Sequence, residues 1–381
     1  MPWRLRRSAN SALGVARSRV IGIDASRLSV AERTGTETYT FNLIHALADL
    51  RSNDDFRLYL NAALPPPDLP PLGDTVSMPF PRFWTHARLS WEMLRRPPEV
   101  LFVPAHVVPV LHPRSVVTIH DLGYLHEPEA HPTAQRRTLD WTTRWSCRSA
   151  RRVIAISDAT RRDLLTHYDV PPDRIIVIPH GVKPTRASEE DVARVRADHD
   201  LPPHFILAVG TIQPRKNLGR LARALSELAR AGLEQHLVVA GKRGWLANEV
   251  EAEIAHSGAS HRIALLGYVA DDDLAGLYAA ADALCFPSLY EGFGLPALEA
   301  MAAGCPVVVS NRGSLPEVAG DAAEIVDPLD VGSIAAGLIR VLTDNARRSV
   351  LIERGWQRAS TFTWARTARE TLGVLRAVRD E

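Results

Sequence analysis

The chain has 381 residues, of which 46% are apolar and 23% are charged, and its formal net charge at neutral pH is +1. That length exceeds one ordinary hydrophobic core and suits two, and the composition is that of a globular protein. A net charge so close to zero gives no general attraction to nucleic acid, so we expect no nucleic-acid partner.

Two features bear on where the protein works. Residues 1–19 contain five arginines and no acidic residue, without the apolar stretch of a signal peptide. We expect a flexible tail, with electrostatic contact to anionic lipid, worth about 1 kcal/mol per basic residue, as the alternative. Cys147, Cys285 and Cys305 match no disulfide framework or metal site. We therefore expect a cytoplasmic protein, with peripheral contact at the inner face of the membrane left open.

Short apolar runs in the first half of the chain predict buried strands. They lie at 20–23, 56–60, 100–103, 116–119, 154–156 and 175–178. After the first run, Thr34-Gly35-Thr36-Glu37 opens a segment with helical spacing of its apolar residues. Gly35 allows close approach to the backbone at a helix N-terminus, which favours anions, and an ordinary turn is the alternative.

His120 and Asp121 follow the strand predicted at 116–119. In an α/β domain this position lies at the carboxyl end of a strand, where ligands bind. The pair can serve as a general base oriented by a carboxylate, or His120 can position a substrate. A structural histidine is the remaining interpretation.

Residues 80–91 are rich in aromatic and basic side chains. The segment holds Arg82, Phe83, Trp84, His86, Arg88 and Trp91. One interpretation is a surface for an acceptor or a membrane. The interpretation that we favour is a helix that packs its aromatic side chains inward.

The strand pattern restarts after a gap. Residues 184–204 contain three prolines and little periodicity, so we place an interdomain linker there. Beyond it, strands are predicted at 205–209, 237–240, 263–266 and 283–286, with helices at 218–231 and 274–280. This alternation predicts an α/β fold with two doubly wound parallel-sheet domains, 20–183 and 205–355, that face each other across a cleft.

A basic loop, Gly210 to Asn217, follows the strand at 205–209. Arg215 and Lys216 in this loop lie at the carboxyl end of that strand and face the expected cleft. Two adjacent cations suit a diphosphate, whose negative charge grows as it leaves. A solvated basic turn is the alternative.

The stretch Glu291–Glu299, of sequence EGFGLPALE, follows the apolar run at 283–286. Pro296 fits the first turn of a helix, which Gly304 ends, so Glu291 lies in the preceding loop and Glu299 inside the helix. The backbone N–H groups at the helix start form an anion site. They belong to the segment Gly292, Phe293, Gly294 and Leu295. A glycine turn with a solvated glutamate is the alternative.

This stretch, continued by AMAAGCPVV over residues 300–308, resembles the donor-site signature of family 4 retaining glycosyltransferases, in their mannosyltransferase-like branch. The resemblance extends from Ile21 to the C-terminal segment. It implies the GT-B fold, in which two Rossmann-like domains face each other, an acceptor domain first and a nucleotide-sugar donor domain second. It also implies that a closing helix, placed here at 356–381, crosses back to complete the first domain.

The resemblance also implies roles for the residues named above. Glu299 is expected to hold ribose hydroxyls, and Glu291 the donor sugar and its developing positive charge. Lys216 matches the lysine of a diphosphate clamp. Many family members place an arginine directly after the strand glycine, where this chain has Thr211, so Arg215 is expected to share the clamp.

Three further positions are carried over. His120 matches a histidine that meets the reacting sugar, which favours its positioning role, Gly35 a loop that faces the diphosphate, and Val269 a position whose backbone meets the base. Trp245 can stack on the base or be a half-buried surface residue.

No metal or other cofactor is expected. Asp271-Asp272-Asp273 has the Asp-x-Asp spacing of metal-dependent glycosyltransferases. Because an apolar helical pattern follows it, we interpret the run as one that caps a helix and complements the helix dipole. The paired cations of the clamp supply the charge that a metal would supply.

We therefore predict a retaining, metal-independent glycosyltransferase that moves a sugar from a nucleoside diphosphate, with GDP-mannose as first guess, to a hydroxyl of a glycan, lipid-linked or metabolite acceptor. The family mechanism implies that the donor phosphate takes the proton of the acceptor. The alternatives are a nucleotide-sugar isomerase or hydrolase on the same scaffold, and a non-catalytic subunit that binds a nucleotide sugar. The sequence does not predict the oligomeric state.

Overall fold

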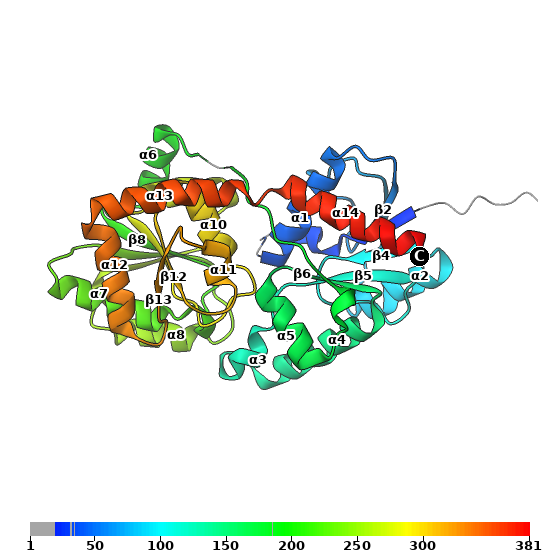
Figure 1. The fold of residues 1–381 in the computed structure, drawn as a ribbon, viewed down its shortest axis with the longest axis horizontal. Helices are drawn as coiled ribbons and strands as arrows, with labels where there is room; N and C mark the ends of the chain where they lie inside the picture. Colours follow the sequence, from blue (N-terminus) through cyan, green and yellow to red (C-terminus); the bar gives the residue numbers. More distant parts are fainter. Residues whose placement is uncertain (1–19, 31–32, 34, 185) are drawn as a thin grey trace, which may run out of the picture.

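The computed structural model describes residues 20–30, 33, 35–184 and 186–381. The predictions for the basic tail at 1–19 and for Thr34 lie outside these residues. Figure 1 shows two α/β lobes side by side, each built around its own sheet. Among the described residues, no helix is both long and apolar enough to cross a membrane.

The first lobe contains a seven-stranded parallel sheet with the order β3-β2-β1-β4-β5-β6-β7. Its strands are β1 (Val20–Asp24), β2 (Asp55–Leu60), β3 (Asp74–Ser77), β4 (Val100–Val103), β5 (Arg114–Ile119), β6 (Arg152–Ala155) and β7 (Ile175–Val177). The central strands are buried along their length, which explains their continuous apolar runs.

The second lobe contains a six-stranded parallel sheet with the order β10-β9-β8-β11-β12-β13. Its strands are β8 (Phe205–Val209), β9 (His236–Ala240), β10 (Ile263–Gly267), β11 (Ala283–Phe286), β12 (Val307–Ser310) and β13 (Glu324–Val326). The predicted α/β fold with two doubly wound domains is confirmed. In both sheets the strand order reverses beside a central strand, the place where α/β proteins bind ligands.

Helices cover both faces of the two sheets. The first lobe has α1 (Gly35–Asp49), α2 (Ser90–Arg95), α3 (Gly123–His126), α4 (Thr133–Ser149) and α5 (Asp158–Tyr168). The chain then forms α6 (Glu189–Asp198), α7 (Leu218–Arg230), α8 (Ala247–Ala255), α9 (Asp271–Ala280), α10 (Leu295–Ala302), α11 (Leu315–Ala319), α12 (Val331–Thr343), α13 (Asn345–Ser360) and α14 (Trp364–Asp380).

The chain passes between the lobes twice. The segment after β7 leads to α6, which lies against α9 of the second lobe through an ion pair of Arg194 with Asp273 at 2.7 Å. Helix α13 packs on α10, and α14 packs on α1 of the first lobe (Figure 1). The return crossing therefore falls at 361–363, a few residues after the position expected for the closing helix.

The segment at 80–91 combines both interpretations of its aromatic residues. A π-helical turn, Trp84–Leu89, leads into α2. Trp84 is buried and donates from Nε1 to the carbonyl of Met78 at 2.9 Å, whereas Phe83 and Trp91 are 78% and 54% exposed. Trp84 packs inward, as in the interpretation that we favoured. Phe83 and Trp91 instead form an exposed aromatic surface.

Candidate functional site

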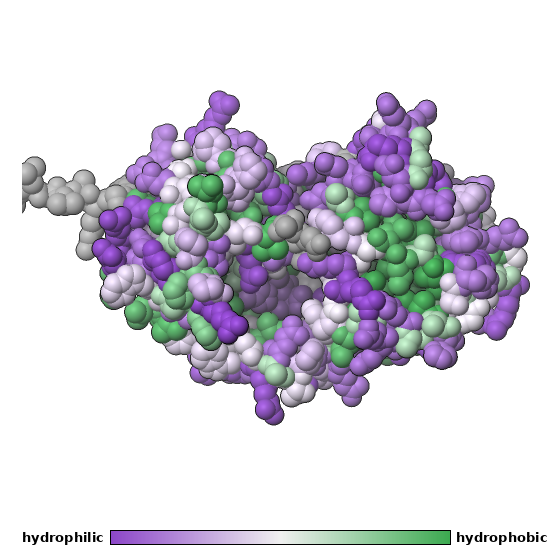
Figure 2. Space-filling view, turned by 180° about the vertical axis from the view of Figure 1, so that it is seen from behind, coloured by the Kyte–Doolittle hydropathy of each residue, from purple (hydrophilic) through white to green (hydrophobic). Residues whose placement is uncertain are grey.

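A cleft of about 510 Å³ lies between the two lobes, at the carboxyl ends of both sheets. Figure 2 shows this hollow from behind. The cleft is lined by predicted residues of both domains. They are Gly35, His120, Arg215, Lys216, Val269, Glu291, Gly292, Phe293, Gly294, Leu295 and Glu299. The fold thus brings together residues up to 264 positions apart, from Gly35 to Glu299.

Glu291 is the centre of an ion-pair network on the cleft wall. Its Oε1 lies 2.7 Å from Lys216 Nζ, and its Oε2 lies 3.1 Å from Arg215 Nη1. Arg215 Nη2 also lies 3.9 Å from Oδ2 of Asp121, which belongs to the first lobe. The network therefore joins the two predicted clamp cations to one carboxylate from each domain.

The charges in this network nearly cancel, because two cations meet two carboxylates. Burial favours protonation of Glu291, but Arg215 and Lys216 outweigh it and hold the pKa of Glu291 below its ordinary value. Burial lowers the pKa of Lys216, which Glu291 partly restores. Burial favours protonation of Asp121 too, but Arg215 outweighs it and holds the pKa of Asp121 below its ordinary value. The two cations are therefore shared with Glu291 and are not bare positive charges on the cleft wall.

The loop that carries the cations is held by Asn217, which sequence reasoning missed. Asn217 adopts the left-handed conformation, with φ of 60°, after the short 3₁₀ turn Pro214–Lys216. Its side-chain amide donates to the carbonyls of Pro287 and Pro328 at 3.0 and 2.7 Å. These bonds fasten the basic loop to the segments that follow β11 and β13, so Lys216 arrives at Glu291 in a fixed geometry.

The glycine-rich loop between β11 and α10 touches the first lobe. A side chain at Gly292 would overlap the backbone of His120, so glycine is needed for this close approach. Gly294 is the N-cap of α10 and Pro296 lies in its first turn, as predicted. The backbone carbonyl of Glu291 accepts bonds from the N–H and hydroxyl of Ser314, both at 3.0 Å. The loop is thus fixed on both sides of the cleft.

His120 presents a hydrogen-bond acceptor to the cleft. Its Nε2 lies 2.7 Å from the carbonyl oxygen of Pro104, which can only accept, so Nε2 carries the proton and Nδ1 keeps a lone pair. Burial lowers the pKa of His120, which keeps the imidazole neutral and makes it a weak base. This arrangement suits the acceptance of a hydrogen bond from a hydroxyl group, in line with a positioning role.

Glu299 lies inside α10 and is paired with a tyrosine. Its Oε2 accepts from the hydroxyl of Tyr278 at 2.9 Å. Burial raises the pKa of Glu299 to about 7, and the negative charge of Asp271 adds to the effect. The carboxylate therefore changes protonation near neutral pH.

The remaining predicted positions have simpler surroundings. Gly35 begins α1 and lines the cleft, with no atom close to where a side chain would start. Val269 is buried on the cleft wall. Trp245 reaches across the cleft, where its Nε1 donates to the carbonyl of Ala130 at 2.6 Å and its ring lies 5.1 Å from that of His131.

The acidic run at 271–273 forms the first turn of α9, after Ala270 as N-cap. In the described residues its side chains make no cap hydrogen bond, so they complement the helix dipole without capping the helix. Asp273 pairs with Arg194 at 2.7 Å.

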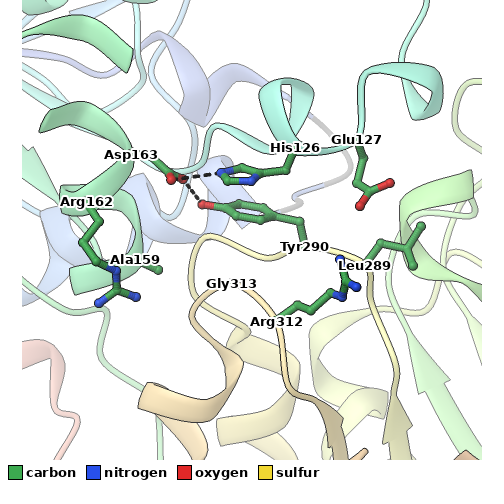
Figure 3. Close-up of a pocket in the computed structure, with 9 residues that line it drawn as sticks. All are labelled: His126, Glu127, Ala159, Arg162, Asp163, Leu289, Tyr290, Arg312 and Gly313. Carbon is green, nitrogen blue, oxygen red and sulfur yellow. Dashed lines mark hydrogen bonds and ion pairs between the residues drawn. The ribbon is translucent and has the colours of Figure 1, made fainter. Parts of the chain in front are cut away.

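A second pocket of about 300 Å³ opens between the lobes beside Tyr290 (Figure 3). Tyr290 donates to Asp163 on α5, and its ring stacks on that of His126 at 4.3 Å. His126 Nε2 lies 2.9 Å from Asp163 Oδ1. His126, Asp163 and His167 together form a group with the spacing of metal ligands. The contact of Tyr290 with Asp163 ties the residue before Glu291 to the first lobe. The sequence contained no compact motif that predicts this contact.

Comparisons with known proteins agree with this geometry. The family model of the glycosyl transferases group 1 matches residues 190–358, and that of glycosyltransferase family 4 matches residues 33–186. O-antigen chain mannosyltransferase B of Escherichia coli is 33% identical over 294 residues, which are 76% of this chain and 77% of that protein.

A further relative and a solved structure differ in what they cover. MMP alpha-(1->4)-mannosyltransferase of Mycolicibacterium hassiacum is 35% identical over 228 residues, 58% of this chain and 53% of that protein. The structure of sucrose-phosphate synthase from Thermosynechococcus elongatus superposes with a TM-score of 0.77 at 21% identity, covering 94% of this chain and 99% of that one. At that identity, the structural likeness supports the GT-B fold alone.

Proposed function

The chain belongs to the family 4 (group 1) glycosyltransferases, and from this premise we propose that it is a retaining enzyme that moves a sugar from a nucleoside diphosphate to an acceptor hydroxyl. The observation that carries the proposal is the network of Glu291 with Lys216 and Arg215, set opposite His120 across the cleft. It combines cations for a leaving diphosphate with a carboxylate for a sugar that becomes positive.

Each residue then has one task in the reaction. Lys216 and Arg215 stabilise the negative charge that grows on the leaving diphosphate, at the place where it develops. Glu291, held ionised by these cations, stabilises the positive charge on the sugar ring. His120 accepts a hydrogen bond from a sugar hydroxyl through Nδ1. The leaving phosphate oxygen takes the proton of the acceptor on the same face, which keeps the configuration of the transferred sugar.

GDP-mannose is the proposed donor, with support from the printed names of two mannosyltransferase relatives. A thermal-shift panel of GDP, UDP, dTDP and ADP, each with and without EDTA, tests it. A nucleotide at a hundred times its Kd adds about 2.7 kcal/mol of stability. Of the four nucleotides, we expect only GDP to raise Tm. We expect EDTA to leave that rise unchanged. Stabilisation by a nucleotide with another base replaces GDP-mannose as the proposed donor. No response to any nucleotide contradicts the proposed function.

Donor affinity is expected to rise with pH through Glu299. The carboxylate can accept bonds from two ribose hydroxyls, and with a pKa of about 7 it is mostly protonated at pH 6 and mostly ionised at pH 8. GDP-mannose, whose diphosphate does not titrate in this range, is expected to bind roughly fivefold to tenfold more tightly at pH 8.

Isothermal titration across this range measures the effect, and Glu299→Gln is expected to flatten it. The same pH slope in the variant assigns the titration to another group. The stability of the free protein depends on pH through Glu299 with the opposite sign. Because the pKa of Glu299 rises from 4.5 to about 7 on folding, its contribution to stability is present at low pH and is lost as pH rises through 7.

We also propose a cytoplasmic location with peripheral membrane contact, through exposed apolar side chains of the first lobe. This aromatic patch consists of Phe80, Phe83, Trp91, Leu94, Val110, Leu111 and Trp141. Its segments touch one another, since Leu111 donates its N–H to Ser90 Oγ at 3.3 Å and the rings of His86 and Trp141 lie 6.4 Å apart. Exposed arginines such as Arg82 and Arg95 add charge that suits anionic lipid.

Removal of two side chains from the aromatic patch is expected to weaken membrane binding. Trp91→Ser with Leu94→Ser removes apolar area worth about 1.5–3 kcal/mol per side chain if both are buried in lipid. Co-sedimentation with phosphatidylglycerol vesicles is therefore expected to fall at least tenfold. Leu329→Ser, which changes an exposed leucine of the second lobe, is the matched control. Equal sedimentation of all three proteins contradicts the membrane contact.

A further inference from the structure

His180 is a buried histidine to which the sequence assigned no role. Its exposed fraction is 5%, and neither ring nitrogen has a hydrogen-bond partner within the described part of the chain. Buried polar groups are almost always paired, because an unpaired one keeps the full cost of its desolvation. Two unpaired nitrogens on one ring leave both nitrogens for a partner outside the polypeptide where the ring lines a cavity, as His180 does.

The backbone around His180 lies where the chain passes between the lobes. The carbonyl of Pro179 accepts from Thr367 Oγ1 at 2.8 Å, and Val182 donates its N–H to the carbonyl of Phe362 at 3.0 Å. A side chain at Gly181 would overlap the backbone of Trp364, so both crossing segments pack tightly here. These contacts fix the position of His180 in the region where the chain crosses between the lobes, here called the hinge.

The ring of His180 also lines the donor cleft. It stacks on Tyr39 of α1 at 4.7 Å, lies 4.7 Å from Phe293 of the glycine-rich loop, and meets His120 edge-on at 5.5 Å. Two of these neighbours, His120 and Phe293, also line the cleft. A ligand that touches them is within reach of His180.

We propose that His180 is a donor-binding residue, whose imidazole N–H donates to an oxygen of the nucleoside-diphosphate sugar and so joins the donor to the interdomain hinge. This inference rests on the proposed function of the cleft. Burial, with the nearby His120, lowers the pKa of His180 well below its ordinary value, so the ring is neutral and offers one donor and one acceptor. The contact is thus a hydrogen bond that a phosphate or hydroxyl oxygen can accept.

The hinge position gives this contact a consequence for domain closure. His180 is fixed by the crossing segments, whereas Phe293 belongs to the donor domain and Tyr39 to the acceptor domain. A donor oxygen bound to His180 is therefore held where the chain crosses between the lobes. We expect the donor to favour one arrangement of the lobes, the one in which this hydrogen bond forms.

His180→Phe tests the proposal, because phenylalanine keeps the aromatic contacts and removes both nitrogens. The variant is expected to fold with unchanged or higher Tm, since it buries no unpaired polar group. Its Kd for GDP-mannose, measured by isothermal titration, is expected to rise about tenfold to a hundredfold, the value of a hydrogen bond to a charged group. His180→Asn, which retains an N–H donor, is expected to recover part of the affinity.

His131→Phe is the matched control. His131 is also buried with two unpaired nitrogens in the described residues, but it does not line the cleft, so its donor Kd is expected to stay at the wild-type value. An unchanged Kd in His180→Phe overturns the inference. A wild-type protein that binds none of GDP-mannose, UDP-glucose and their nucleotides overturns the proposed function as well.

A second measurement covers the case in which His180→Phe does not fold. In wild-type protein with ¹⁵N-labelled histidine, the imidazole N–H resonance of His180 is expected to shift downfield when GDP-mannose is added. Its assignment comes from His180→Asn. A resonance that does not move at saturating donor overturns the inference.

Discussion

Lys216→Ala is expected to lower kcat/KM for the donor by about a hundredfold to a thousandfold, the loss seen when one preorganised donor to a developing anion is removed. The ammonium of Lys216 has three donors, and among the described residues Glu291 Oε1 takes one of them at 2.7 Å. The remaining capacity faces the cleft, where the leaving diphosphate gains charge in the transition state. Because that gain is largest in the transition state, the loss is expected mainly in kcat.

Steady-state kinetics with GDP-mannose measures the effect, with Tm recorded in parallel. Arg223→Ala is the matched control, because it removes one positive charge from an exposed position of the same domain. A small change in that variant and a large one in Lys216→Ala separate the clamp from the general field of the domain. Near-wild-type activity in Lys216→Ala contradicts the diphosphate clamp.

The central strands of both sheets, except β12 (Val307–Ser310), were predicted from the sequence because they are buried on two faces. β4 (Val100–Val103) and β11 (Ala283–Phe286) coincide with their apolar runs. The edge strands β3 (Asp74–Ser77) and β13 (Glu324–Val326) were not predicted. They are three or four residues long and contain polar residues, so they pair through the backbone without a hydrophobic pattern.

Which residues reach the cleft was predictable, but how they pair was not. The motif around Glu291 and the basic loop at Lys216 each follow a strand, and parallel strands place such loops at one edge. That Glu291 would neutralise Arg215 and Lys216 depends on a contact across 75 sequence positions. His180 escaped notice because its significance lies in unpaired atoms, and a sequence does not show which atoms are paired.

Glu291→Gln is expected to separate turnover from product binding. Loss of the carboxylate removes the stabilisation of the positively charged sugar, so kcat is expected to fall by about a hundredfold to a thousandfold. The same change releases Lys216 and Arg215 from their shared partner, which leaves more positive charge for a diphosphate. GDP is therefore expected to bind the variant at least as tightly as the wild type, although the enzyme is nearly inactive.

Stability is expected to fall in the free variant, because removal of one member of a buried ion pair costs about 3–5 kcal/mol. GDP is expected to restore more of the Tm in Glu291→Gln than it adds to the wild type. Glu324→Gln is the matched control, since Glu324 is also buried and pairs with two cations, Arg340 at 2.6 Å and Arg347, away from the cleft. It is expected to lose stability and keep kcat. If GDP binds Glu291→Gln tenfold more weakly than it binds the wild type, then Glu291 contacts the nucleotide, and its place beside the transferred sugar is wrong.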